Sequence, residues 1–199
     1  MTLELEFLDQ TIMGNSLLQW AFAVIALLLS YLLLRMAKLI AGRRLAAFAT
    51  RTETPWDDVV AQAINKTKPV FLLIAAIFIG SQLLQLPERI QSNIHNLYVI
   101  ALQIQAGIWL GVITISALEH HRQRALKKNP AAATTINAIG FLSKIVIWSV
   151  VVLVALDNLG INVTALVAGM GIGGVAVALS VQNILGDLFA SLSIILDKP

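Results

Sequence analysis

The sequence contains no cysteine and few charged side chains, and both shortages narrow the class of protein. Of its 199 residues only 14 are Lys or Arg and 11 are Asp or Glu, 13% in all, whereas 58% are hydrophobic. An average soluble domain carries roughly 25% charged residues. So few charges could not cover the surface of a soluble globule of this size. With 12 glycines, 5 prolines and no cysteine, collagen-like chains and disulfide scaffolds are excluded as well.

Long apolar stretches instead predict an all-α membrane protein. A helix needs about 20 mostly apolar residues to cross a bilayer. Five stretches of about this length each contain at most one Lys, Arg, Asp or Glu. We therefore predict five transmembrane helices, near residues 15–36, 69–86, 94–118, 134–156 and 162–184.

Basic residues gather in two of the predicted loops. The loops are residues 35–68 (Arg35, Lys38, Arg43, Arg44, Arg51, Lys66 and Lys68) and residues 119–135 (Arg122, Arg124, Lys127 and Lys128). The opposite side has only Arg89 before the chain ends are counted. Since short loops rich in Lys and Arg face the cytoplasm, we expect the N-terminus outside and the C-terminus in the cytoplasm.

Local signals predict helical structure in the first basic loop. Residues 37–49 alternate apolar and basic side chains and should be helical. Thr54 and Pro55 have the residue types of an N-cap and a first helical position, so a short amphipathic helix should follow over residues 58–66 and lead into the second span. Asn158-Leu159-Gly160 predicts a turn before the last span.

Polar side chains inside the spans have competing interpretations. Gln103 and Gln105 are expected to bond between helices, with a permeation path as the alternative. Lys144 is expected to reach the headgroups or a lipid phosphate, with a buried ion pair as the alternative. The adjacent His120 and His121 are interpreted as solvated residues, and no metal site is predicted.

The last span is unusually rich in glycine and alanine. Between residues 168 and 178 these are Ala168, Gly169, Gly171, Gly173, Gly174, Ala176 and Ala178. Each glycine inside a helix costs roughly 1 kcal/mol relative to alanine, so their number requires a reason. Residues 169–174 match the nucleotide-binding pattern G-x-G-x-x-G, but they lie inside a charge-free run of spanning length that leaves no room for the rest of the βαβ unit. Close helix packing is the better explanation.

At about 100° per residue, the small residues of this helix fall on two opposite faces. One face holds Gly171, Gly174 and Ala178, and the other holds Gly169, Gly173, Ala176 and Ser180. Two bulky stripes lie between them, Ile172, Val175, Leu179 and Gln182 on one side and Met170, Val177, Val181 and Ile184 on the other. Two smooth faces allow each helix to contact two identical neighbours in a closed ring, although ordinary packing within one monomer would also use them.

Residues 169–199 resemble the pore helix of the small-conductance mechanosensitive channel (MscS-like) family. The resemblance is carried by the Gly/Ala-rich helix, Gln182, an amphipathic second half-helix and the terminal Lys198-Pro199. It implies a homoheptamer whose pore is constricted by rings of Val175 and Leu179. The helix-packing positions that it implies are Gly171, Gly174, Ala176 and Ala178. The implied kink lies at Gln182, Asn183 or Gly186, since Asn183 stands where the family commonly has glycine.

The implied function is a channel in the bacterial inner membrane that membrane tension opens during hypo-osmotic stress. Its partners would be membrane lipids and copies of itself, and its permeants ions and small osmolytes, with no cofactor, nucleic acid or enzymatic activity. Residues 1–129 would form the membrane-sensing helices, and residues 130–199 the fourth span and pore helix, ending where the family's cytoplasmic β-domain would begin. The alternatives are a secondary transporter, or a non-conducting membrane scaffold if the chain truly ends at residue 199.

Overall fold

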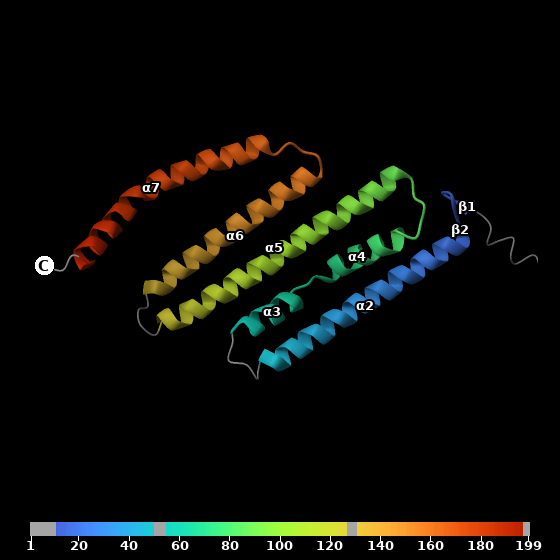
Figure 1. The fold of residues 1–199 in the computed structure, drawn as a ribbon, viewed down its shortest axis with the longest axis horizontal. Helices are drawn as coiled ribbons and strands as arrows, with labels where there is room; N and C mark the ends of the chain where they lie inside the picture. Colours follow the sequence, from blue (N-terminus) through green and yellow to red (C-terminus); the bar gives the residue numbers. More distant parts are fainter. Residues whose placement is uncertain (1–10, 50–54, 127–130, 197–199) are drawn as a thin grey trace, which may run out of the picture. The chain divides into compact units, whose positions relative to one another are not determined.

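The computed structural model is helical apart from one short hairpin, and it describes residues 11–49, 55–126 and 131–196 (Figure 1). The hairpin pairs β1 (Thr11–Ile12) with β2 (Asn15–Ser16). The helices are α2 (Leu17–Ala49), α3 (Pro55–Asn65), α4 (Pro69–Ser81), α5 (Glu88–Leu126), α6 (Ala131–Asn158) and α7 (Thr164–Leu196). The chain divides into two compact units, Met1–Leu159 and Gly160–Pro199. The assignment of residues 1–129 to membrane sensing and of residues 130–199 to the fourth span and pore helix stays a prediction.

Within the described residues, four helices are long and apolar enough to cross a membrane on their own. They are Leu17–Leu45, Glu88–Glu119, Ile136–Asn158 and Thr164–Ser191. These segments confirm four of the five predicted spans. The first basic loop is also helical as predicted, because α2 continues through it to Ala49.

The second predicted span differs from the expectation of one straight helix over residues 69–86. Helix α4 ends at Ser81 after 13 residues, which reach about 20 Å, short of the roughly 30 Å hydrocarbon core. Helix α3 precedes it at an angle of 69°, and only the two together are long and apolar enough to span. The predicted amphipathic helix is therefore present as α3, beginning at Pro55, whereas its expected N-cap, Thr54, lies outside the described residues.

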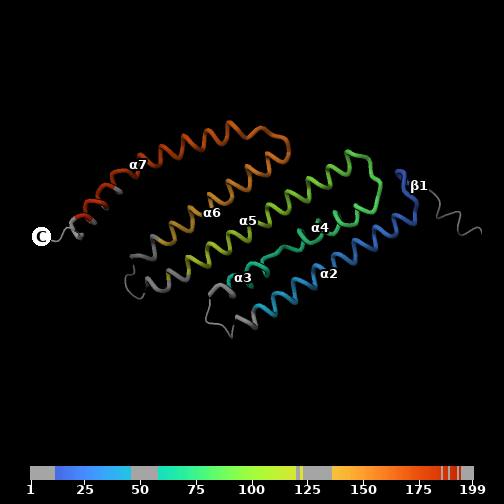
Figure 2. The backbone as a smooth tube through the Cα atoms, in the orientation of Figure 1, coloured from blue at the N-terminus to red at the C-terminus, as the bar shows by residue number. Residues whose placement is uncertain are grey.

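Helix α5 connects the elements of the first unit. It contacts α6, and it also contacts α3 and α4, which lie between α5 and α2 (Figure 2). Two glycines allow close approach in these contacts. A Cβ at Gly80 would lie 2.8 Å from the carbonyl oxygen of Ala23, and a Cβ at Gly107 would lie 2.7 Å from Cγ2 of Val151. Small residues therefore set the α2–α4 and α5–α6 spacings.

Side chains from two other helices satisfy the backbone where α3 bends into α4. The Lys68 amide donates to Gln105 Oε1 at 2.9 Å, and the Trp109 indole donates to the Thr67 hydroxyl at 3.1 Å. Lys38 Nζ donates to the Thr67 carbonyl. A break in a membrane helix exposes polar backbone groups that lipid cannot satisfy, so these bonds make the bend tenable. The expected interhelical bond is thus confirmed for Gln105, whereas Oε1 of Gln103 has no partner among the described residues.

Replacing Gln105 with leucine should lower the stability of the full chain. Gln105 is only 1% exposed, and the Lys68 amide would lose the oxygen that accepts its hydrogen bond. The bond is partly buried, so the loss should be at most about 1–3 kcal/mol, the cost of an unsatisfied buried donor. The loss would be measured as a lower midpoint of thermal unfolding in detergent. Gln103→Leu is the matched control, since Oε1 of Gln103 accepts no bond within the described structure. Equal losses in both variants would contradict the role of Gln105 at the bend.

The hairpin at the start of α2 has no counterpart in the sequence-based prediction. Its turn places Met13 and Gly14 at φ 52° and 80°, the positive values that a type I′ turn requires. Asn15, fully buried, donates to the Gln85 carbonyl at 2.9 Å and accepts from the Gln85 amide at 2.7 Å. Ser16 and Gln19 then form a reciprocal capping box that starts α2. The hairpin consequently fastens the beginning of α2 to the loop after α4.

Candidate functional site

Helix α7 begins from a well-defined turn. Gly160 adopts φ +77°, and the Leu159 amide donates to the Ala155 carbonyl at 3.2 Å, which closes the end of α6. Asn162 Oδ1 accepts from the Thr164 amide at 2.9 Å and satisfies one of the first donors of α7. The turn predicted at Asn158-Leu159-Gly160 is confirmed.

Every residue of α7 from Thr164 to Ile184 is exposed. The apolar side chains share this exposure, at 60% for Val175 and 63% for Leu179. A Cβ added at any glycine of α7 would meet no atom within 4 Å, unlike those at Gly80 and Gly107. Within the unit Gly160–Pro199 the small residues of α7 therefore have no packing partner.

One face of α7 carries an open apolar groove. It is lined by Val175, Ala178, Leu179, Gln182, Gly186 and Phe189. These positions lie within about 100° of one another on an ideal helix, so the two predicted constriction residues share a face with Gln182. The structure does not bring Gly171, Gly174 or Ala176 into this groove. Phe189 was not predicted, although its spacing of two helical turns from Gln182 is the signal that could have identified it.

The three predicted kink positions lie within one continuous helix. Helix α7 runs uninterrupted from Thr164 to Leu196, and its ribbon curves along its length (Figure 1). Gln182, Asn183 and Gly186 are exposed on it. The Ser180 hydroxyl donates to the Ala176 carbonyl at 2.9 Å, a bond within the helix that often accompanies bending. The position of a kink stays a prediction.

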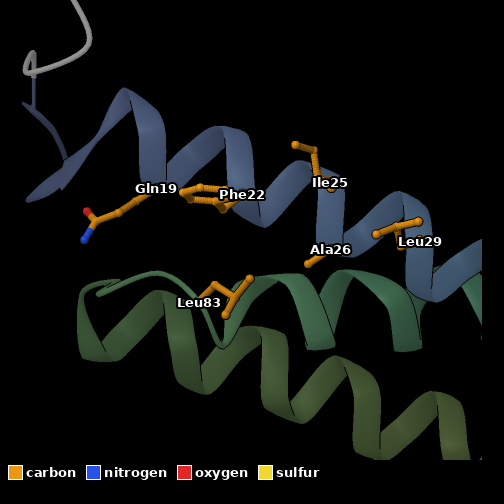
Figure 3. A pocket seen from close by; sticks show the side chains of 6 residues that line it. All are labelled: Gln19, Phe22, Ile25, Ala26, Leu29 and Leu83. Carbon is orange, nitrogen blue, oxygen red and sulfur yellow. The ribbon is translucent and has the colours of Figure 1, made fainter. Parts of the chain in front are cut away.

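A second open groove lies on the first unit and is equally apolar. Gln19, Phe22, Ile25, Ala26 and Leu29 of α2 line it together with Leu83, and Figure 3 shows their side chains around it. Gln19 is its one polar residue, and none of the six can act as an acid, a base or a metal ligand. A groove of this composition is better suited to contact with lipid chains than to catalysis or metal binding.

Titratable residues do not assemble into a reactive site in the part of the chain that is described. No group of three or more His, Cys, Asp or Glu residues there could hold a metal ion. The side chains of His120 and His121 lie outside the described part. Lys144 is exposed on α6, beside Glu119 and Arg122 of α5.

Comparison with known proteins finds a family model that matches the fourth and fifth apolar helices. Residues 141–182, from α6 into α7, match the family model described as the mechanosensitive ion channel, transmembrane helices 2/3. No solved structure matches the chain.

Similarity over almost the whole of this chain extends to two channels from Methanocaldococcus jannaschii. The large-conductance mechanosensitive channel MscMJLR is 22% identical over 98% of this chain, and the small-conductance channel MscMJ is 27% identical over 96%. The chain spans 55% of the length of each. An uncharacterised MscS family protein of Helicobacter pylori strain 26695 is 32% identical over 70% of this chain and 23% of its own length.

These matches agree with the arrangement of apolar helices and with the glycine-rich α7. They concern channels and not enzymes. The chain thus belongs to the MscS family of mechanosensitive channels, with residues 141–182 as its transmembrane helix 2/3 region.

Proposed function

We propose that this chain forms a homo-oligomeric channel that membrane tension opens, releasing ions and small solutes during hypo-osmotic stress. The exposure of α7 carries the proposal, since its apolar span has no buried residue in the described chain. Copies of α7 can cover one another through the small faces of Gly171, Gly174, Ala176 and Ala178. The family resemblance favours seven copies.

In the closed state, rings of Val175 and Leu179 form the constriction. Both side chains lie on the groove face, one helical turn apart. A narrow apolar constriction excludes water and blocks ions without a physical plug. No Lys, Arg, Asp or Glu occurs between Asp157 and Asp187, so the membrane part offers no fixed-charge filter and selectivity should be weak.

Tension shifts a two-state equilibrium toward the conformation that occupies more membrane area. The lipid-facing helices of the first unit bear the load, and the turn at Gly160 connects them to α7. The glycine and alanine faces let neighbouring copies of α7 slide without unlocking large side chains. A bend at Gln182, Asn183 or Gly186 would let the two halves of α7 move separately.

The N-terminus lies outside the cell and the basic loops lie in the cytoplasm. The loops at residues 35–68 and 119–135 carry most of the Lys and Arg, which supports this orientation, and the family resemblance favours the inner membrane. A secondary transporter receives less support, because Lys144 is the one charged residue inside the last three predicted spans.

Patch recordings from liposomes that contain the full chain test the proposal. We expect stepwise currents that appear with suction, with a reversal potential close to zero in a potassium chloride gradient. A chain that assembles in the bilayer but stays silent up to the tension that ruptures the patch would instead be a non-conducting scaffold. Currents independent of tension would contradict mechanical gating.

A further inference from the structure

A short linker, residues 66–68, forms the joint between α3 and α4. Helix α3 ends at Asn65, and α4 begins at Pro69. Lys68 is extended, with φ −78° and ψ 139°, which is the conformation that a following proline favours, so the helix is interrupted there. Thr67, a polar residue, is only 7% exposed within the joint. The local sequence thus produces the break, but it does not fix the angle of 69° between the two helices.

Helix α2 holds the joint through two residues that lie one helical turn apart. Lys38 Nζ donates to the Thr67 carbonyl. Gly42 is buried, and a Cβ there would lie 2.6 Å from Asn65 Oδ1, so the end of α3 occupies the space that a side chain at this position would fill. Lys38 lies within the apolar span Leu17–Leu45, where a backbone carbonyl is a suitable partner for an ammonium. Its charge also complements the negative end of the α3 dipole.

Helix α5 holds the joint from the opposite side, since α3 and α4 lie between α5 and α2 (Figure 2). Gln105 Oε1 accepts from the Lys68 amide at 2.9 Å, and the Trp109 indole donates to the Thr67 hydroxyl at 3.1 Å. The Trp109 ring also meets the ring of Phe71, in the first turn of α4, edge to face with 6.2 Å between the centroids. Trp109 therefore contacts both the joint and the helix that follows it.

We infer that Lys38 and Trp109 are positioning residues for gating, which hold the joint at a fixed angle so that α2, α3, α4 and α5 move as one body under membrane tension. Their two donors converge on one buried residue, Thr67. A free joint would let tension change the angle between α3 and α4 instead of displacing the helices connected to α7. A tightly packed, fixed joint transmits the displacement. The inference rests on the proposed channel function.

Spin labels on α3 and α4 measure whether the joint is fixed. Because the chain has no cysteine, Val60→Cys and Ile79→Cys supply a unique pair of labelling sites, and both positions are exposed. An excess of unlabelled copies in the liposomes ensures that each pair reports on one chain. Lys38→Met and Trp109→Phe together should broaden a narrow distance distribution, since each lost hydrogen bond raises the population of the free joint about five-fold. An equally narrow distribution in that double variant would overturn the inference.

Patch recordings of the full chain measure whether the fixed joint matters for gating. Lys38→Met and Trp109→Phe should each raise the suction threshold, and both should leave the single-channel conductance unchanged because the joint lies outside the proposed pore. Lys38→Arg should keep the original threshold, since a guanidinium can also donate to the Thr67 carbonyl. Arg35→Met removes an exposed cation from the same helix and is the matched control, which should gate like the unmodified channel.

The two measurements separate failure of this inference from failure of the channel proposal. An unchanged or lower threshold in both variants, with a broadened distance distribution, would overturn the role in gating and leave the channel function standing. An equal rise in Arg35→Met would overturn it in favour of a general effect of charge on α2. A silent unmodified chain would contradict the channel function and the gating role together, whereas the label distances would still decide whether Lys38 and Trp109 fix the joint.

Discussion

Serine in place of Val175 or Leu179 should lower the membrane tension at which the channel opens. Each replacement removes apolar groups from the proposed constriction and adds a hydroxyl that holds water, which stabilises the wet, conducting state. The closed state should lose on the order of 1 kcal/mol of stability per subunit, because each CH₂ group removed from an apolar contact contributes about 0.8 kcal/mol. A ring repeats the change in every copy, so the closed state loses several kcal/mol.

The measurement is the suction threshold in liposome patches, with the unmodified channel recorded in matched patches. Ile184→Ser is the control, because Ile184 is 66% exposed but lies on the opposite bulky stripe of α7. It should leave the threshold near its original value. Unchanged thresholds in both Val175→Ser and Leu179→Ser, or an equal decrease in Ile184→Ser, would remove the constriction assignment.

Leucine at Gly174 should abolish assembly and with it all tension-activated current. Within the unit Gly160–Pro199 a Cβ at Gly174 meets nothing within 4 Å, so the larger side chain causes no clash inside that unit. Helix propensity would even favour the variant, by about 1 kcal/mol over glycine. We therefore expect the loss to arise between subunits, where the added side chain would separate two copies of α7.

Native gels and chemical cross-linking of the full chain would report the loss of the oligomer, and thermal unfolding in detergent would report the intact subunit. Val177→Leu adds bulk to a stripe outside the small faces and serves as the control, with assembly and currents retained. A Gly174→Leu variant that assembles and gates normally would contradict packing through this face.

Hydropathy predicted the helical class and four of the spans because the bilayer imposes the same demand on every crossing helix. About 20 apolar residues must follow one another, and their backbone groups must bond within the helix. The start of α3 at Pro55 and the turn at Gly160 were also predictable, since they depend on neighbouring residues. The candidate constriction at Val175 and Leu179 is implied by the family resemblance, and helical spacing adds only that both residues lie on one bulky stripe.

The bent second span was beyond such local signals. The break before its short α4 is stabilised by side chains distant in the sequence, such as Gln105, which reaches the Lys68 amide 37 residues away. The bond between Asn15 and Gln85 joins positions 70 residues apart, and Lys144 comes to lie beside Glu119 and Arg122 only after α5 packs on α6. Apolar length and helix-turn spacing are properties of a continuous segment, so the sequence alone determined four of the spans and the two-faced pattern of α7. The tertiary structure alone decided which polar groups meet, because a buried hydrogen bond depends on the distance between atoms in space and leaves no periodic mark on the chain.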